Sequence, residues 1–198
     1  MLPSPIAERL KQDTSVIAES YNEVTILFAD LVGFTKLASQ IAPTELVNLL
    51  NQLFSKFDEL SEKHGLEKIK TIGDAYMVVG GLPTPGSDRA AAVAQMALDM
   101  QEVIAQMSIT QNFPEIRIGI NTGSVVAGVI GVKKFIYDLW GDAVNIASRM
   151  ESSGAAGKIQ VTDTTYELLK HQYRFEQRGP VLVKGRGEMI TYWLLGKK

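Results

Sequence analysis

The chain has 198 residues, of which 45% are hydrophobic and 21% charged, so it is long enough for one α/β domain with a full core and short for two. Its formal net charge of −2 argues against a general nucleic-acid binder, which normally carries a basic surplus. Because it has no cysteine, disulfides, thiolate metal sites and cysteine nucleophiles are excluded. No apolar run is long enough to cross a bilayer, and the first residues lack a signal-peptide pattern.

Residues 1–20 are polar with sparse apolar positions, and we expect them to form a connector segment that contains a short helix from Ile6 to Lys11. The main domain is then predicted to span residues 21–198.

The first predicted strand covers residues 23–30 and is apolar on both faces, as is typical of a central strand covered by helices. It ends at Asp30, and a glycine turn at Gly33 leads into a helix. Backbone N–H groups at such a turn are free to bind phosphate oxygens, although the lysine and glycine spacing of a Walker loop is missing.

Two long helices are predicted, one over residues 43–64 with apolar residues at helical spacing and one over residues 89–107 that is rich in Ala and Met. Between them, residues 66–81 read as a hairpin with its tip at Gly73 and Asp74.

Residues 114–123 alternate like a strand, and we expect residues 124–131 to be its hairpin partner because glycines favour turns and close backbone approach. A strand-to-helix corner at 137–142 leads into a helix over 142–152, which carries Asn145 and Arg149 on one face. A short strand at 159–161, a capped short helix and terminal strands over 174–195 follow. This order predicts a mixed, largely antiparallel sheet with helices packed on it.

Asp30 and Asp74 both stand at the ends of predicted strands. Mg²⁺ prefers one or two carboxylates together with substrate phosphates and water, so one hypothesis is a divalent-metal site for a nucleoside triphosphate. The alternative is that each aspartate caps its own turn.

Lys70 and Asp138 are a second candidate pair. A lysine donor beside an aspartate acceptor complements N1 and the 6-amino group of adenine, although the same charges could meet guanine in another pose. A structural salt bridge is the alternative. Asn145, Arg149, Lys133 and Lys184 supply the amide and cationic groups that phosphoryl transfer needs, or they are solvated surface residues.

Four segments together resemble the class III adenylyl and guanylyl cyclase catalytic domain. They are Phe28-Ala29-Asp30-Leu31-Val32-Gly33-Phe34-Thr35, Ile69-Lys70-Thr71-Ile72-Gly73-Asp74, residues 137–150 (YDLWGDAVNIASRM) and Val183-Lys184-Gly185-Arg186-Gly187. The resemblance covers about residues 21–195, and residues 2–20 resemble the connector that precedes the domain in receptor-type members.

The resemblance implies an α+β fold with a ferredoxin-like βαββαβ core and extra C-terminal strands. It also implies that Asp30 and Asp74, with the Leu31 carbonyl, bind two Mg²⁺ or Mn²⁺ ions per site. Amides from Leu31 to Thr35, including those of Phe34 and Thr35, would cradle phosphates.

For the remaining site residues the resemblance implies that Lys70 and Asp138 read the purine. Guanylyl members typically carry Glu at the first of these positions and a small or different polar residue at the second, so the pair implies ATP. Asn145 would orient the ribose, Arg149 would stabilise the transition state, and Lys184 would contact the triphosphate. Some relatives have Arg in place of Lys133.

The activity implied is conversion of ATP to 3′,5′-cyclic AMP and pyrophosphate in signal transduction, with no nucleic-acid partner. The family works as a head-to-tail dimer whose sites combine the metal carboxylates of one subunit with the purine pair, Asn145 and Arg149 of the other. The resemblance therefore implies a homodimer and a cytoplasmic catalytic domain, with room for an upstream sensor or a membrane-attached parent protein.

Three alternatives stay open at this point. They are a guanylyl cyclase, because residues 71–76 are equally typical of those members, a degenerate cyclase domain that only dimerises and regulates, and an RNA-binding ferredoxin-like module. The last would need exposed aromatic residues on the sheet with basic neighbours.

Overall fold

The computed structural model describes the whole chain except residues 1–2, 13–16, 84–85, 87, 112 and 132–133. Its helices are Ser4–Gln12 (α1), Phe34–Ala38 (α2), Pro43–Lys63 (α3), Arg89–Gln111 (α4), Asp142–Ser152 (α5) and Asp163–Leu169 (α6). Its strands are Ala18–Leu31 (β1), Glu67–Ile72 (β2), Ala75–Gly80 (β3), Ile116–Ile130 (β4), Ile136–Trp140 (β5), Ile159–Thr162 (β6), Tyr173–Val183 (β7) and Gly187–Lys197 (β8).

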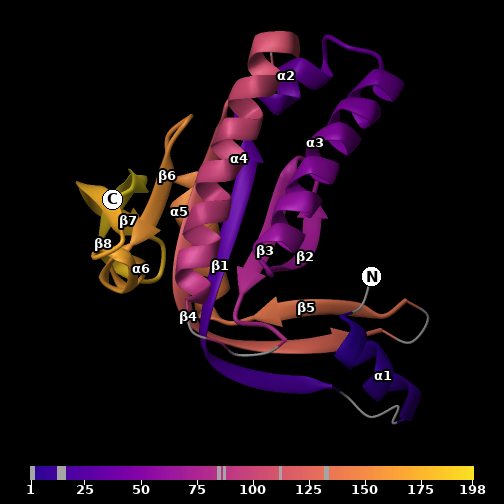
Figure 1. The fold of residues 1–198 in the computed structure, drawn as a ribbon, viewed down its shortest axis with the longest axis vertical. Coiled ribbons are helices and arrows are strands. Elements are labelled where there is room, and N and C mark those ends of the chain that lie inside the picture. Colours follow the sequence, from indigo (N-terminus) through magenta and orange to yellow (C-terminus); the bar gives the residue numbers. More distant parts are fainter. Residues whose placement is uncertain (1–2, 13–16, 84–85, 87, 112, 132–133) are drawn as a thin grey trace.

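All described strands join one sheet in the order β2-β3-β1-β4-β6-β8-β7, and β5 pairs with part of β4 (Figure 1). Every pair is antiparallel except β4 with β6. The first four strands with α3 and α4 form the expected βαββαβ core, and β6 to β8 extend it. The predicted fold class is therefore confirmed.

Helices cover both faces of this sheet because its central strands are apolar on both sides. On one face, α3 and α4 bury Leu53, Phe57 and the methionine row against Leu27 of β1. On the other face, Ile26 and its neighbours pack against α5, α1 and β5. The methionines predicted to fill gaps are core residues: Met96, Met100 and Met107 are all 5% exposed or less.

Two predicted strand boundaries are wrong. β1 begins at Ala18, not at residue 23, and its first half pairs with β4 beyond a register shift between Tyr21 and Val24. The predicted hairpin between 114–123 and 124–131 does not exist, because β4 runs unbroken through both segments and makes its hairpin with β5. The glycines there provide close approach and not turns. A Cβ at Gly119 would lie 1.9 Å from the Glu151 amide nitrogen, and one at Gly123 would lie 2.9 Å from Ala143 Cβ.

The other predicted elements are confirmed within a few residues, including the hairpin with its tip at Gly73 and Asp74. Thr162 caps α6, its hydroxyl accepting the Thr165 amide. Part of the predicted connector, residues 1–2 and 13–16, lies outside the described residues, and its boundary at residue 20 stays a prediction. No helix among the described residues is long and apolar enough to cross a membrane.

Candidate active site

Two carboxylates meet where β1 ends beside the β2–β3 turn. Asp30 is the second-last residue of β1, and Asp74 occupies the turn after Gly73, whose φ of 62° favours glycine. The two carboxylates lie close enough for Asp74 to act on the titration of Asp30, so the predicted convergence is present. Burial, followed by the negative charge of Asp74, raises the pKa of Asp30 to about 6.

Arg117 links this pair to α5. It lies opposite Asp30 across β1 and β4, with Nη2 3.5 Å from Asp30 Oδ2, and its Nε donates to Glu151 Oε1 at 2.6 Å. Burial raises the pKa of Glu151, while Arg117 acts in the opposite direction. We name Asp30, Asp74, Arg117 and Glu151 the acidic corner. The sequence prediction missed its last two members, although Arg117 is visible as a charge between two isoleucines of the predicted strand 114–123.

The donor set of the acidic corner fits divalent cations. The charge of Asp74 raises the cost of ionising Asp30, and a cation between the two carboxylates would offset it. Among the described residues, no group of three or more His, Cys, Asp or Glu side chains could hold a metal ion. Leu31 is buried, so only its backbone carbonyl is suited to ligation.

Lys70 of β2 and Asp138 of β5 form an ion pair with each other. Asp138 Oδ1 also accepts the Leu139 amide at 2.8 Å, which holds its carboxylate in place. The side chains of Lys70 and Asp138 keep 36% and 16% of their exposure. The structure thus brings together the two residues expected to read the base, and in it their opposite charges are paired with each other.

Asn145 and Arg149 line a groove of about 630 Å³ between α5 and the β7–β8 turn, together with Lys184. Both residues are exposed, and they lie on one face of α5, as the helical spacing predicted. The helix lies close to the sheet because β4 places Gly119 and Gly123 beneath it. An amide and two cations therefore face one open groove.

The remaining candidates fall elsewhere. Phe34 and Thr35 begin α2, where the Lys36 amide donates to the Gly33 carbonyl at 3.0 Å, so their own amides precede that bond. Their role as a phosphate cradle stays a prediction. Lys133 lies outside the described residues.

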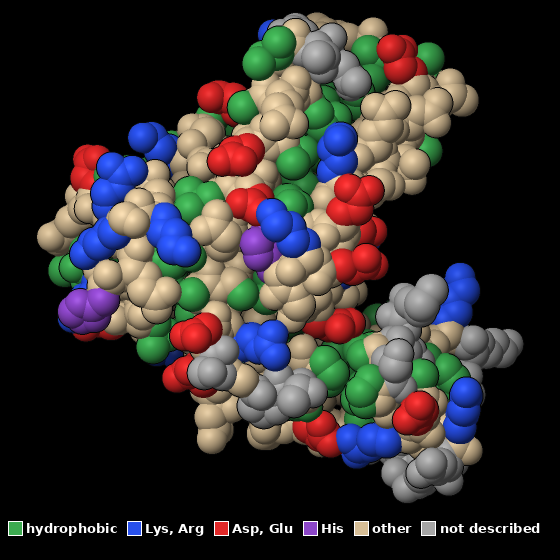
Figure 2. Space-filling view, in the orientation of Figure 1, with side chains coloured by type: hydrophobic (Ala, Val, Ile, Leu, Met, Phe, Trp, Pro, Cys, Tyr) green, Lys and Arg blue, Asp and Glu red, His purple; other side chains and the backbone are tan. Residues whose placement is uncertain are grey.

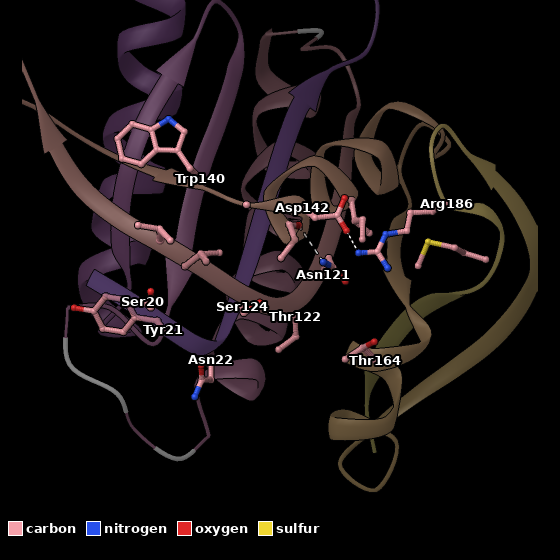
Figure 3. A pocket seen from close by; sticks show the side chains of 17 residues that line it. Ser20, Tyr21, Asn22, Asn121, Thr122, Ser124, Trp140, Asp142, Thr164 and Arg186 are labelled. Carbon is pink, nitrogen blue, oxygen red and sulfur yellow. Dashed lines mark hydrogen bonds and ion pairs between the residues drawn. The ribbon is translucent and has the colours of Figure 1, made fainter. Parts of the chain in front are cut away.

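A second hollow, of about 570 Å³, adjoins the groove on the other side of α5 (Figure 3). Asp142, Ile146 and Arg186 line both hollows. Asn121 projects from β4 and donates to the Ala143 carbonyl at 3.0 Å, and Asp142 forms an ion pair with Arg186. Both contacts tie the first turn of α5 to neighbouring elements.

The ion pairs and hollows of the described residues sort the candidates into three groups: the acidic corner, the Lys70–Asp138 pair and the α5 groove. This fold thus carries paired carboxylates, a lysine–aspartate ion pair and a groove lined by two cations. The sequence profile described as "Adenylate and Guanylate cyclase catalytic domain" matches residues 16–196. The chain belongs to this family, as the resemblance of its motifs predicted.

The relatives include cyclases named for each nucleotide. An adenylate cyclase of Mycobacterium tuberculosis is 53% identical over the whole chain, which spans 45% of that protein. The receptor-type guanylate cyclase gcy-13 of Caenorhabditis elegans is 47% identical over the whole chain, which spans 20% of it. The chain thus spans less than half the length of these relatives.

A solved structure agrees with the fold throughout. The guanylate cyclase domain of RhGC from Catenaria anguillulae in complex with GTP has a TM-score of 0.88 and 38% identity, covering 91% of this chain and 100% of that one. The architecture is therefore that of a nucleotidyl cyclase catalytic domain. Because some relatives are named for adenylate and others for guanylate, the choice between ATP and GTP has to be argued from the site residues.

Proposed function

We propose that this domain is an adenylate cyclase that converts ATP to 3′,5′-cyclic AMP and pyrophosphate. The observation that carries the choice of ATP is the Lys70–Asp138 pair. The Lys70 ammonium is a donor that can meet the acceptor N1 of adenine, and the Asp138 carboxylate beside it is an acceptor that can meet the 6-amino group. The 53% identity to a relative named adenylate cyclase supports the same choice.

In the proposed reaction the ribose 3′-oxygen attacks the α-phosphorus, a new oxygen–phosphorus bond closes the ring, and the bond to the pyrophosphate breaks. Asn145 holds the ribose so that the hydroxyl faces the phosphorus. Arg149 donates to the oxygens on which charge grows, and Lys184 binds the leaving pyrophosphate. Water or the substrate takes the hydroxyl proton, so no side chain of this chain need be the base.

Two Mg²⁺ or Mn²⁺ ions held by Asp30, Asp74 and the Leu31 carbonyl would neutralise the leaving group and acidify the attacking hydroxyl. Arg117 keeps Asp30 in place for them, through the contact at 3.5 Å. It is also a cation near the position proposed for the triphosphate.

We further propose that the active site forms between two copies of the chain arranged head to tail, which take part in signalling in the cytoplasm. Among the described residues no ion pair links the acidic corner, the Lys70–Asp138 pair and the α5 groove to one another. The β4–β5 arm exposes apolar residues that a partner could cover: Ile130, Phe135, Ile136 and Trp140 are 41 to 53% exposed. Figure 2 shows a notch between the α3 layer and the part of the molecule that carries α1 and this arm.

Mixing two inactive variants tests this composite site. Asp74→Ala removes a carboxylate and Arg149→Ala removes the cation, and each variant alone should form little cyclic AMP. In a mixed dimer one site carries both defects and the other carries neither, so an equal mixture should regain about a quarter of the wild-type rate. A mixture as inactive as its components would overturn the shared site, provided both variants dimerise in sedimentation experiments.

A guanylate cyclase is the second candidate, and it is favoured by one observation. A relative named as a guanylate cyclase is 47% identical over the whole chain. Product analysis with ATP and GTP separates the two candidates, and a degenerate regulatory domain would form neither product.

A further inference from the structure

The β7–β8 turn reaches the start of α5 through one ion pair. Arg186 stands at the tip of the turn between Gly185 and Gly187, whose φ angles are 85° and 79°. Its guanidinium binds the carboxylate of Asp142, in the first turn of α5 (Figure 3). An acidic residue at that position is also favourable for the helix dipole.

The base of the same turn is fixed by apolar contacts, while its tip stands clear. Val183 packs in a small cluster with Ile146 and Met150 of α5. By contrast, no atom would lie within 4 Å of a Cβ added at Gly185 or Gly187. The Asp142–Arg186 ion pair therefore restrains the tip of the β7–β8 turn, which packing against its neighbours does not restrain.

This tip matters because Lys184 stands next to it. Lys184, Arg186 and Asp142 all line the groove that contains Asn145 and Arg149. Arg186 is paired with Asp142, so its charge in the groove is partly neutralised. Among the described residues Lys184 has no such ion pair, and its position depends on the tip of the turn.

We propose that Asp142 and Arg186 form a clamp that positions Lys184 against the substrate triphosphate. They are positioning residues, and this inference rests on the proposed cyclase function. Since both side chains are at least 50% exposed, the clamp should contribute little to the stability of the fold. Its loss should weaken nucleotide binding in the ground state more than it slows the chemical step.

The test is a double-mutant cycle of Asp142→Asn and Arg186→Gln, with Lys184→Ala as the upper limit of the effect. Each single variant should raise KM for ATP about tenfold with kcat changed less than about twofold, and the double variant should be no worse than either. The matched control is the exposed Glu167–Lys170 pair on α6, where Glu167→Gln should leave KM unchanged. If only Arg186→Gln raised KM, Arg186 would bind substrate itself and the clamp would be wrong.

A second readout needs no activity. Because the chain has no cysteine, Glu188→Cys places a single nitroxide label at the start of β8, beside the turn. Asp142→Asn and Arg186→Gln should each increase the mobility of the label in its electron paramagnetic resonance spectrum, and Glu167→Gln should not. An unchanged spectrum would overturn the clamp even if the protein proved to make no cyclic nucleotide, whereas absent turnover in the wild type would overturn only the proposed function.

Discussion

The acidic corner and the Lys70–Asp138 pair differ in how well their charges are satisfied. In the acidic corner, Asp30 and Asp74 lie against each other, and burial with that neighbouring charge raises the pKa of Asp30 to about 6. Lys70 and Asp138 have opposite charges and satisfy each other. In the proposed enzyme a cation between the two aspartates would lower the cost of ionising Asp30, and a purine base would replace the contact between Lys70 and Asp138. The comparison therefore separates a proposed metal site from a proposed base-reading site.

The largest effect should come from removing the carboxylate at the tip of the β2–β3 turn. Asp74→Asn should reduce cyclic AMP formation by about a thousandfold or more, because charge neutralisation at the transferring phosphoryl group is lost. The measurement is the rate of product formation with saturating Mn²⁺. Glu59→Gln, an exposed acid on α3, is the control. Turnover by Asp74→Asn at the control's rate would refute the acidic corner as the metal site.

Changing the Lys70–Asp138 pair should alter the preference between ATP and GTP without abolishing turnover. Lys70→Glu combined with Asp138→Ser should shift the ratio of kcat/KM for ATP over GTP toward GTP by about a hundredfold, since each base contact is worth about 1–3 kcal/mol. Competition assays with both nucleotides measure the ratio. Lys158→Glu reverses an exposed charge outside the site, and an equal shift in that variant would show that the pair does not read the base.

Arg117 should hold the acidic corner together in the absence of metal. Arg117→Gln leaves Asp30 and Glu151 without their shared cation and should lower the free energy of unfolding by about 2 kcal/mol. Chemical denaturation in EDTA measures this loss. Added Mn²⁺ should recover part of it, because a cation at Asp30 replaces some of the missing positive charge. If Arg117→Gln lowered the free energy of unfolding equally with and without Mn²⁺, Arg117 would not act on the proposed metal site.

The smallest effect is a pH dependence of stability. Because the pKa of Asp30 is raised in the folded protein, the stabilisation from its protonated form is complete below about pH 4 and is lost as the pH rises through about 6. In EDTA, the melting temperature of the wild type should therefore fall relative to that of Asp30→Asn over this range, by a few degrees at most. If the melting temperatures of the two proteins changed in parallel with pH, the fold would not raise the pKa of Asp30.

Local pattern was sufficient for the parts of the fold that form from neighbouring residues. The apolar spacing of α3 and the hairpin around Gly73 are readable because each depends on contacts within a short segment. The alternation of Ile26 and Leu27 likewise assigned two faces to β1. These elements carry Asp30, Asp74 and Lys70, so most of the candidate site followed from motifs on correctly predicted elements.

The parts that failed depend on distant contacts. Gly119 and Gly123 look like turn residues, but they lie inside β4 because α5 packs directly on the backbone there. Glu151 was not among the predicted site residues, and the structure places it against Arg117. Nothing in the local sequence shows which residue lies across a sheet or beneath a helix, and both the wrong hairpin and the missed Glu151 depend on such contacts.

The most direct test is to incubate the purified domain with Mn²⁺ and equal concentrations of ATP and GTP, over a range of protein concentrations, and to quantify both cyclic products. The pairing of Lys70 with Asp138 predicts cyclic AMP as the main product, with a rate per chain that rises with protein concentration as dimers form. Cyclic GMP as the main product, or no cyclic product at any concentration, would contradict the account.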